Sequence, residues 1–253
     1  MSNFKIAWLF PDTLFLHGER GNLLALARFA QLAGFEPEIQ KVDFTSATFA
    51  PEEYDIIFCA PGEISSFPAV RDWLLPYKAQ LREYVDGGRP MLVTGTSVGL
   101  FGKQILRSDG SEAEGLGIIF TQFSENKAVY GDDIWFECEY NNEKMEIIGN
   151  QIQMGDLNIV SEKPFGHLRY GYGNTGKDRN EGVLRGNSIF TNTLGPMLVC
   201  NPWLTEEIIR VAAAARDITV GDFGYEPTLE RRSFATKQKF IETKETGLTN
   251  CGR

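Results

Sequence analysis

Histidine is scarce in this 253-residue chain, which contains only His17 and His167. Histidine is the side chain that most readily changes charge near neutral pH, so a mechanism that needs a histidine base has few options here. The four cysteines lie far apart and form no C-x-x-C pair. This spacing gives no sign of a zinc or redox site, and it indicates reduced thiols in a cytosolic setting. We therefore predict no metal and no cofactor.

Positive charge and long apolar runs are also in short supply. The chain has 25 Lys and Arg against 34 Asp and Glu, a formal net charge of -9. Nucleic-acid binding needs a basic face, so we expect no nucleic-acid partner. No apolar run approaches the ~20 residues of a membrane span, and the N-terminus, MSNFKIAWLFPD, lacks the basic region of a signal peptide. We expect a cytoplasmic protein.

Apolar runs in the first half of the chain alternate with segments of helical spacing. Strands are predicted at 5–10, 35–42, 54–59 and 90–94. Helices are predicted at 21–34, within 68–85, and from 99 into 106. This alternation indicates an α/β fold with a mostly parallel sheet and helices on both faces. Ligands of such sheets bind at the carboxyl ends of the strands.

The later part of the chain has a different pattern. Residues 117–195 contain short strand-like runs separated by turns. A final helix is predicted over 204–215, with Thr205 as its N-cap. Residues 217–253 are polar and weakly patterned, with at most a short helix in FATKQKFIETKE. The predicted organisation is one domain over 1–216 followed by a tail or docking arm over 217–253.

One segment joins an apolar run, a glycine-bearing turn and a helix-like stretch: residues 93–103, VTGTSVGLFGK. Inside it, GTSVG at 95–99 matches the G-x-S-x-G pattern of a nucleophile elbow, a strained strand-to-helix turn that exposes the nucleophile. Ser97 is the candidate nucleophile on this pattern alone. A single match to so short a pattern is weak, and no HGGG-type oxyanion motif accompanies it.

Four segments have the order and spacing of one known family. They are LHGERGN at 16–22, LFGKQILRSDGSEAEGLGIIF at 100–120, YGYGNTGKDRNEGV at 170–183 and NSIFTNTLGPMLVCNPWL at 187–204. Together they resemble the CobB/CobQ-like class I glutamine amidotransferases, most closely the glutaminase subunit of lipid II isoglutaminyl synthase. The resemblance implies a three-layer, flavodoxin-like fold with additional β-strands. It also implies a role in amidating a peptidoglycan precursor, beside a Mur-ligase-like synthetase subunit.

The residues that would perform glutamine hydrolysis depart from the family. The reaction needs a nucleophile, a base and backbone donors for the oxyanion. An ungapped alignment of 90–103 puts the family's cysteine at Gly95, and the loop that ends His-Gly-Pro in the family puts the histidine at Leu194. Neither side chain can attack or transfer a proton. In the turn expected to supply an oxyanion donor, Pro61 lacks an N–H.

Two interpretations follow from these departures. The favoured one is a catalytically degenerate amidotransferase-like subunit that binds or regulates a partner. The alternative is an active glutaminase that supplies ammonia to the synthetase through a displaced nucleophile, Ser97 or Cys59, with His17 as a candidate base.

The expected pocket lies where the loops after three strands meet, and it would hold glutamine or another small molecule. Its predicted lining residues are His17, Arg20, Ala60, Gly62, Glu63 and Thr96. The simpler interpretation is structural: the glycines set turns, and the hydroxyls of Thr96 and Ser97 cap the helix that follows.

Overall fold

The computed structural model describes residues 2–250, and side chains through residue 244. Its central sheet has six strands in the order β11-β12-β4-β3-β1-β2. Their bounds are β1 Asn3–Leu9, β2 Glu36–Val42, β3 Ile56–Cys59, β4 Met91–Thr94, β11 Val183–Arg185 and β12 Ser188–Thr191. All neighbours pair in parallel except β11, which runs antiparallel to β12 at the edge.

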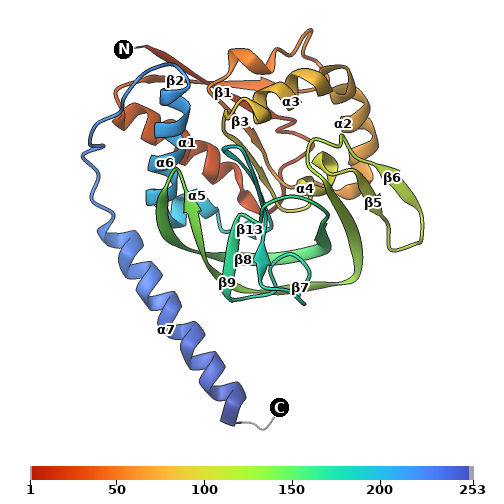
Figure 1. The fold of residues 1–253 in the computed structure, drawn as a ribbon, viewed down its shortest axis with the longest axis vertical. Helices are drawn as coiled ribbons and strands as arrows, with labels where there is room; N and C mark the ends of the chain where they lie inside the picture. The colour runs from red at the N-terminus through yellow and green to blue at the C-terminus, as the bar shows by residue number, and fades with distance from the viewer. Residues whose placement is uncertain (1, 251–253) are drawn as a thin grey trace.

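Helices cover both faces of this sheet (Figure 1). They are α1 Arg20–Leu32, α2 Phe67–Leu74, α3 Lys78–Asp86, α4 Ser97–Phe101, α5 Met197–Cys200 and α6 Pro202–Ala214. Short 3₁₀ turns occur at η1 Leu16–Gly18, η2 Pro51–Glu53, η3 Ile64–Ser66 and η4 Leu75–Tyr77. The layers confirm the predicted α/β fold.

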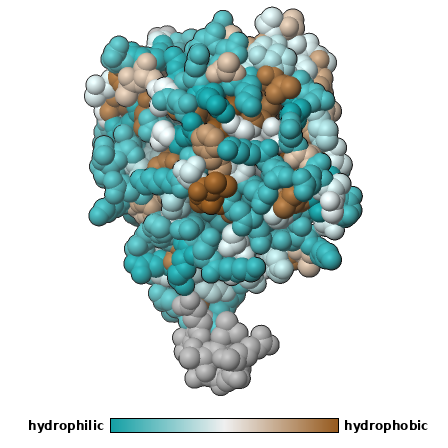
Figure 2. All heavy atoms as spheres, turned by 45° about the vertical axis from the view of Figure 1, so that its right-hand side comes forward, coloured by the Kyte–Doolittle hydropathy of each residue, from teal (hydrophilic) through white to brown (hydrophobic). Residues whose placement is uncertain are grey.

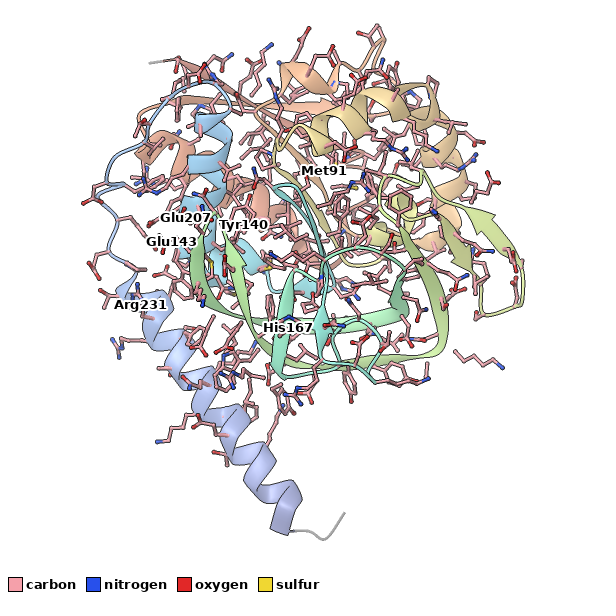
Figure 3. The ribbon with its side chains drawn as sticks, in the orientation of Figure 1. Met91, Tyr140, Glu143, His167, Glu207 and Arg231 are labelled. Atoms are coloured by element: carbon pink, nitrogen blue, oxygen red, sulfur yellow. The ribbon has the colours of Figure 1, made fainter. Side chains whose placement is uncertain are left out.

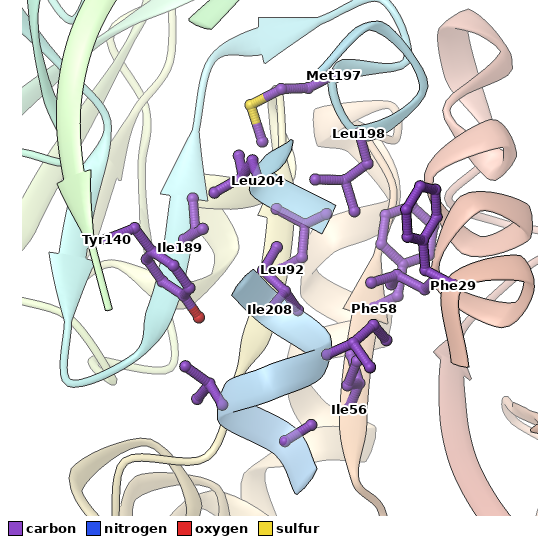
Figure 4. Close-up of a cluster of buried hydrophobic side chains, with 14 of the residues drawn as sticks. Phe29, Ile56, Phe58, Leu92, Tyr140, Ile189, Met197, Leu198, Leu204 and Ile208 are labelled. Atoms are coloured by element: carbon purple, nitrogen blue, oxygen red, sulfur yellow. The ribbon is translucent and has the colours of Figure 1, made fainter. Parts of the chain in front are cut away.

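Strands β3 and β4, in the middle of the sheet, are almost entirely apolar because both of their faces are buried, as in other parallel sheets. On β3, Ile56 and Phe58 enter one core with α1, α5 and α6, shown in Figure 4. Ile57 and Cys59 enter the opposite core with α2, α3 and α4. The two-residue period of a strand divides its side chains between these layers.

A second sheet packs beside the first and is built on a long hairpin. Its strands are β5 Gln104–Leu106, β6 Glu112–Glu114, β7 Thr121–Tyr140, β8 Glu143–Ile159, β9 Gly166–Tyr170, β10 Asn180–Glu181 and β13 Thr193–Leu194. Asn141 and Asn142 turn the hairpin with positive φ, which asparagine tolerates. Strand β13 pairs with β8, so the loop that carries Leu194 is fixed to the hairpin.

The prediction that residues 68–85 contain a helix is confirmed, and the region holds two helices separated by a 3₁₀ turn that contains Pro76. Two other local predictions are wrong. The helix expected from 99 into 106 ends at Phe101, and residues 104–106 form β5. Thr205 is not an N-cap, because α6 begins at Pro202 and the Thr205 hydroxyl donates to the Leu198 carbonyl inside the core.

The tail is more structured than its composition indicates. Its first part packs on the body, with the rings of Phe223 and Tyr225 against Phe29. Helix α7 then runs from Thr228 to Asn250, so the expected short helix is in fact 23 residues long. It contacts the hairpin through Lys237 and Lys244, and its C-terminal end projects beyond the body in Figure 1. The boundary at residue 216 stays a prediction.

The surface is mainly hydrophilic on the face seen in Figure 2, where apolar side chains form small separate groups. In the described part of the chain, no helix has the length and apolarity needed to cross a membrane.

Candidate functional site

The elbow lies at the carboxyl end of β4, in the middle of the central sheet. Strand β4 ends at Thr94 and α4 begins at Ser97, so the turn consists of Gly95 and Thr96. Gly95 has a φ of 59°, in the left-handed region that favours glycine. The Gly95 N–H donates to the Thr191 carbonyl on β12 at 2.8 Å. The structure therefore places Gly95, rather than Ser97, at the apex of the turn.

The space beside Gly95 is filled by the other two altered positions. A Cβ atom built on Gly95 would lie 2.9 Å from Cβ of Pro61 and 3.4 Å from Cδ2 of Leu194. The first distance is too short for two carbon atoms, and Leu194 is only 2% exposed. The positions that the sequence alignment assigns to the family's cysteine and histidine thus meet in space, together with the turn after β3. In this chain they form an apolar contact.

Ser97 lies in the first turn of α4 and is fully buried. Its hydroxyl donates to the Ala60 carbonyl at 2.7 Å, and it also lies beside the Cys59 thiol. Within the described residues, no hydrogen bond joins Ser97 to His17, which is exposed on η1. The pairing expected of an activated serine is therefore not formed.

Thr96 and Ser97 do not cap α4, which corrects the structural interpretation of the motif. The Thr96 hydroxyl donates to the Gly62 carbonyl at 2.6 Å and accepts from the Gly62 N–H at 3.2 Å. Together with the Ser97 bond to Ala60, these contacts fasten the elbow to the turn after β3. Pro61 has no N–H and that of Gly62 is engaged, so this turn presents no free donor from either residue to an oxyanion.

The remaining pocket residues separate in the structure. Ala60 and Gly62 are buried, and Gly62 packs against Leu14. Glu63, His17 and Arg20 are exposed. Partial burial lowers the pKa of His17, which favours its neutral form. Neither of the two cavities described for the protein is lined by any of these residues.

The cysteines near the elbow are unreactive in this setting. Burial raises the pKa of Cys59 to about 12, against a smaller opposing effect of the Ser97 hydroxyl. Burial also raises the pKa of Cys200. The thiolate is the nucleophilic form of cysteine, so both side chains are poor nucleophiles at neutral pH. Among the residues that the structure describes, no group of three His, Cys, Asp or Glu side chains could hold a metal ion.

A clasp between α1 and the Leu194 loop was missed from the sequence. The Glu19 carboxylate accepts from the Gly195 N–H at 2.9 Å and from the Asn22 amide at 2.6 Å. The Asn22 side-chain oxygen accepts from the Leu198 N–H at 2.8 Å. Burial raises the pKa of Glu19 to about 7, although both of its donors oppose the shift. The GERGN stretch therefore holds the loop that carries Leu194.

A second buried carboxylate holds the same loop from the other side. One Glu181 oxygen accepts from the hydroxyl of Thr193 at 2.9 Å and from the Asn192 N–H at 3.0 Å. It also accepts from the Thr191 hydroxyl. Burial raises the pKa of Glu181, and these donors oppose the shift. Glu19 and Glu181 both lie in segments that resemble the family, but the sequence does not show which groups their carboxylates contact.

Comparisons with known proteins show what the chain as a whole is similar to. No family model matches the chain. A relative from Staphylococcus aureus, named lipid II isoglutaminyl synthase (glutamine-hydrolyzing) subunit GatD, is 27% identical over 220 residues, 86% of this chain and 88% of the relative. The subunit of the same name from Streptococcus pneumoniae is 26% identical over 213 residues, 82% of this chain and 80% of the relative. Over more than four-fifths of its length, the chain is therefore similar to glutamine-hydrolyzing subunits of this name.

One solved structure supports the fold of the chain. A chain in the structure of PurLQS from Thermotoga maritima aligns with a TM-score of 0.52 at 14% identity, over 86% of this chain and 99% of that chain. At this identity the likeness concerns the fold alone. It supports the layered amidotransferase-like architecture in which Gly95, Pro61 and Leu194 meet.

Proposed function

We propose that this protein is a catalytically degenerate, amidotransferase-like subunit of a lipid II amidation type system. In this proposal it acts in the cytoplasm, where it binds or regulates a Mur-ligase-like synthetase. The two GatD relatives support the system, because both are named as subunits of lipid II isoglutaminyl synthase. The observation that carries the degeneracy is the contact of Pro61 and Leu194 around the side-chain-free apex at Gly95.

The chemistry of this contact opposes glutamine hydrolysis at three points. Gly95 offers no nucleophile, and Leu194 offers no proton acceptor. Pro61 takes up the space that a side chain at the apex would need. The buried clasps made by Glu19 and Glu181 still hold the loop in position. This combination suits a protein whose scaffold serves a partner rather than a reaction.

The helix α7 is a proposed docking arm for that partner. It extends beyond the body (Figure 1) and carries exposed apolar side chains, Leu229 at 73% and Phe240 at 55% exposure. We propose in addition that the protein is CobB/CobQ-like and that it forms a hetero-oligomer with the synthetase.

The test compares two nitrogen sources for the synthetase complex. With ammonium as the source, the complex should amidate the precursor. With glutamine as the source, we expect no amidation and no ammonia release above a protein-free control.

The alternative function, an active glutaminase that uses Ser97, predicts the opposite outcome. Ammonia would be released from glutamine, and Ser97→Ala would abolish the release. Thr96→Ala is the matched control, because it also removes a hydroxyl that bonds the same turn but leaves Ser97 in place. Release that survives Thr96→Ala and is lost in Ser97→Ala would overturn the degenerate assignment.

A further inference from the structure

A large groove lies away from the elbow, between the hairpin tip and the C-terminal helices. Its volume is about 1040 Å³. Its walls come from the end of β7, the start of β8, the start of β9 with the residues before it, α6 and the first turns of α7. Figure 3 shows Glu143 and Glu207 close together beside the hairpin tip, with Arg231 on α7 near the same opening.

The lining of the groove has more acidic than basic side chains, and two of its glutamates, Glu137 and Glu207, are paired with Arg169 and Arg210 outside the lining. Six glutamates line it against two lysines and one arginine: Glu137, Glu139, Glu143, Glu146, Glu206 and Glu207. Within the described residues, the carboxylates of Glu139 and Glu143 make no ion pair and no hydrogen bond. Carboxylates crowded in a concave surface focus a negative potential that attracts cations.

The groove is also lined by aromatic rings that can accept a guanidinium group. Trp203 and Phe234 meet edge to face, with their ring centroids 5.7 Å apart. The guanidinium of Arg231 lies over the Trp203 ring at 5.4 Å from its centroid. The chain's own arginine thus shows the contact that this wall supports, because a cation over an indole ring is favourable.

We propose that this groove binds an extended, arginine-bearing segment of a protein partner. Carboxylates would pair with the guanidinium groups, and the Trp203 ring would stack on one of them in competition with Arg231. The inference rests on the proposed function only in that the protein works with a partner. The peptide experiments below need neither the synthetase nor glutamine, so their failure is distinguishable from failure of the proposed function.

The first experiment titrates the full chain by calorimetry with an acetylated hexapeptide of alternating arginine and glycine. Glu139→Gln with Glu143→Gln should weaken binding about fivefold, because two unpaired carboxylates are lost. Glu36→Gln with Glu52→Gln makes the same change in net charge at exposed sites outside the groove, and it should leave the affinity unchanged. Equal weakening by both double variants would overturn the proposal.

The second experiment uses the arginine that already occupies the ring. Arg231→Ala should strengthen peptide binding about threefold, because it uncovers Trp203 and removes a competing cation. Arg232→Ala makes the same charge change one residue along, outside the lining of the groove. If both variants gained the same affinity for the peptide, the effect would come from net charge alone, and the assigned site would be contradicted.

A third titration, with spermidine, distinguishes a site for an arginine-bearing peptide from a site that binds any polycation. Spermidine carries comparable charge but no guanidinium group, so it should bind at least about tenfold more weakly than the peptide. Affinity for spermidine equal to that for the peptide would overturn the assignment of a peptide partner.

Discussion

Gly95 is held between Pro61 and Leu194, so the apex of the elbow has no room for a side chain. Two separate effects would oppose any substitution there. A non-glycine residue would be strained at a φ of 59°, and its Cβ would overlap Pro61. Gly224 has nearly the same φ of 60° but nothing within 4 Å of a built Cβ. This pair of glycines allows the two effects to be measured apart.

We expect Gly95→Ala to lower the free energy of unfolding more than Gly224→Ala does. The difference should be about 1–3 kcal/mol, the usual cost of overpacking a core. Denaturant titration of both variants measures it. Adding Pro61→Gly to Gly95→Ala should recover part of this difference. Equal losses of unfolding free energy at the two glycines would mean that Pro61 moves aside without destabilising the fold.

Glu19 should make stability depend on pH in a defined direction. Its pKa is raised from 4.5 to about 7 in the folded protein, so the folded state binds the proton more tightly than the unfolded chain does. This contribution is complete below about pH 4.5 and is lost as the pH rises through 7. Glu19→Gln should therefore reduce the loss of stability between pH 5 and 8, by roughly 1–3 kcal/mol.

The control is Glu36→Gln, which removes a carboxylate at an exposed position away from the Gly195 loop. Thermal unfolding at several pH values measures both variants. An unaltered profile in Glu19→Gln would show that the carboxyl is ionised throughout this range.

At the scale of elements, α7 is fastened to the hairpin by charge rather than by a broad apolar face. Lys237 and Lys244 both bond Asp133, at 3.0 Å each, and Lys244 also bonds Asp132 at 2.6 Å. The Asp133 side chain is only 15% exposed, so these pairs are less screened than ordinary surface pairs. The arm's position therefore depends on a few ion pairs.

Replacing both lysines, Lys237→Met with Lys244→Met, should release α7 from the hairpin. Amide hydrogen exchange in α7 should accelerate about tenfold, while exchange in β4 stays unchanged. Lys239→Met alters an exposed lysine of the same helix and serves as the control. Unchanged exchange in the double variant would mean that apolar contacts such as the buried Ile241 hold the helix.

Elements were predictable where a local pattern determined them. The central strands are continuous apolar runs, and the ungapped register of Gly102 and Lys103 put Gly95 at the apex that the structure shows. The helix expected after Gly99 fails because Gly102 ends it and β5 pairs with distant β7. Helix α7 was underestimated because its anchors, Lys237 and Lys244, bond strand residues more than 80 positions away. Such contacts leave no local pattern.

In the whole molecule, the sheet brings together three segments that are distant in sequence, around residues 61, 95 and 194. Parallel strands end at one edge, so their loops meet there whether or not they catalyse a reaction. The same topology that would assemble a nucleophile, a base and an oxyanion turn assembles a proline, a glycine and a leucine here. The fold therefore limits where reactivity could be restored.

Restoring two reactive groups should not suffice without removing the obstruction. Gly95→Cys with Leu194→His supplies a thiol and an imidazole, but Pro61 still occupies the space at the apex. Adding Pro61→Gly should raise labelling of the new thiol by a glutamine-analogue electrophile about tenfold or more, because small displacements of a reacting group cost that much. Mass spectrometry of the labelled peptide measures this, and Ser97→Cys with Pro61 intact should stay weakly labelled. Equal labelling with and without Pro61→Gly would show that Pro61 does not limit the reactivity of a thiol at the apex.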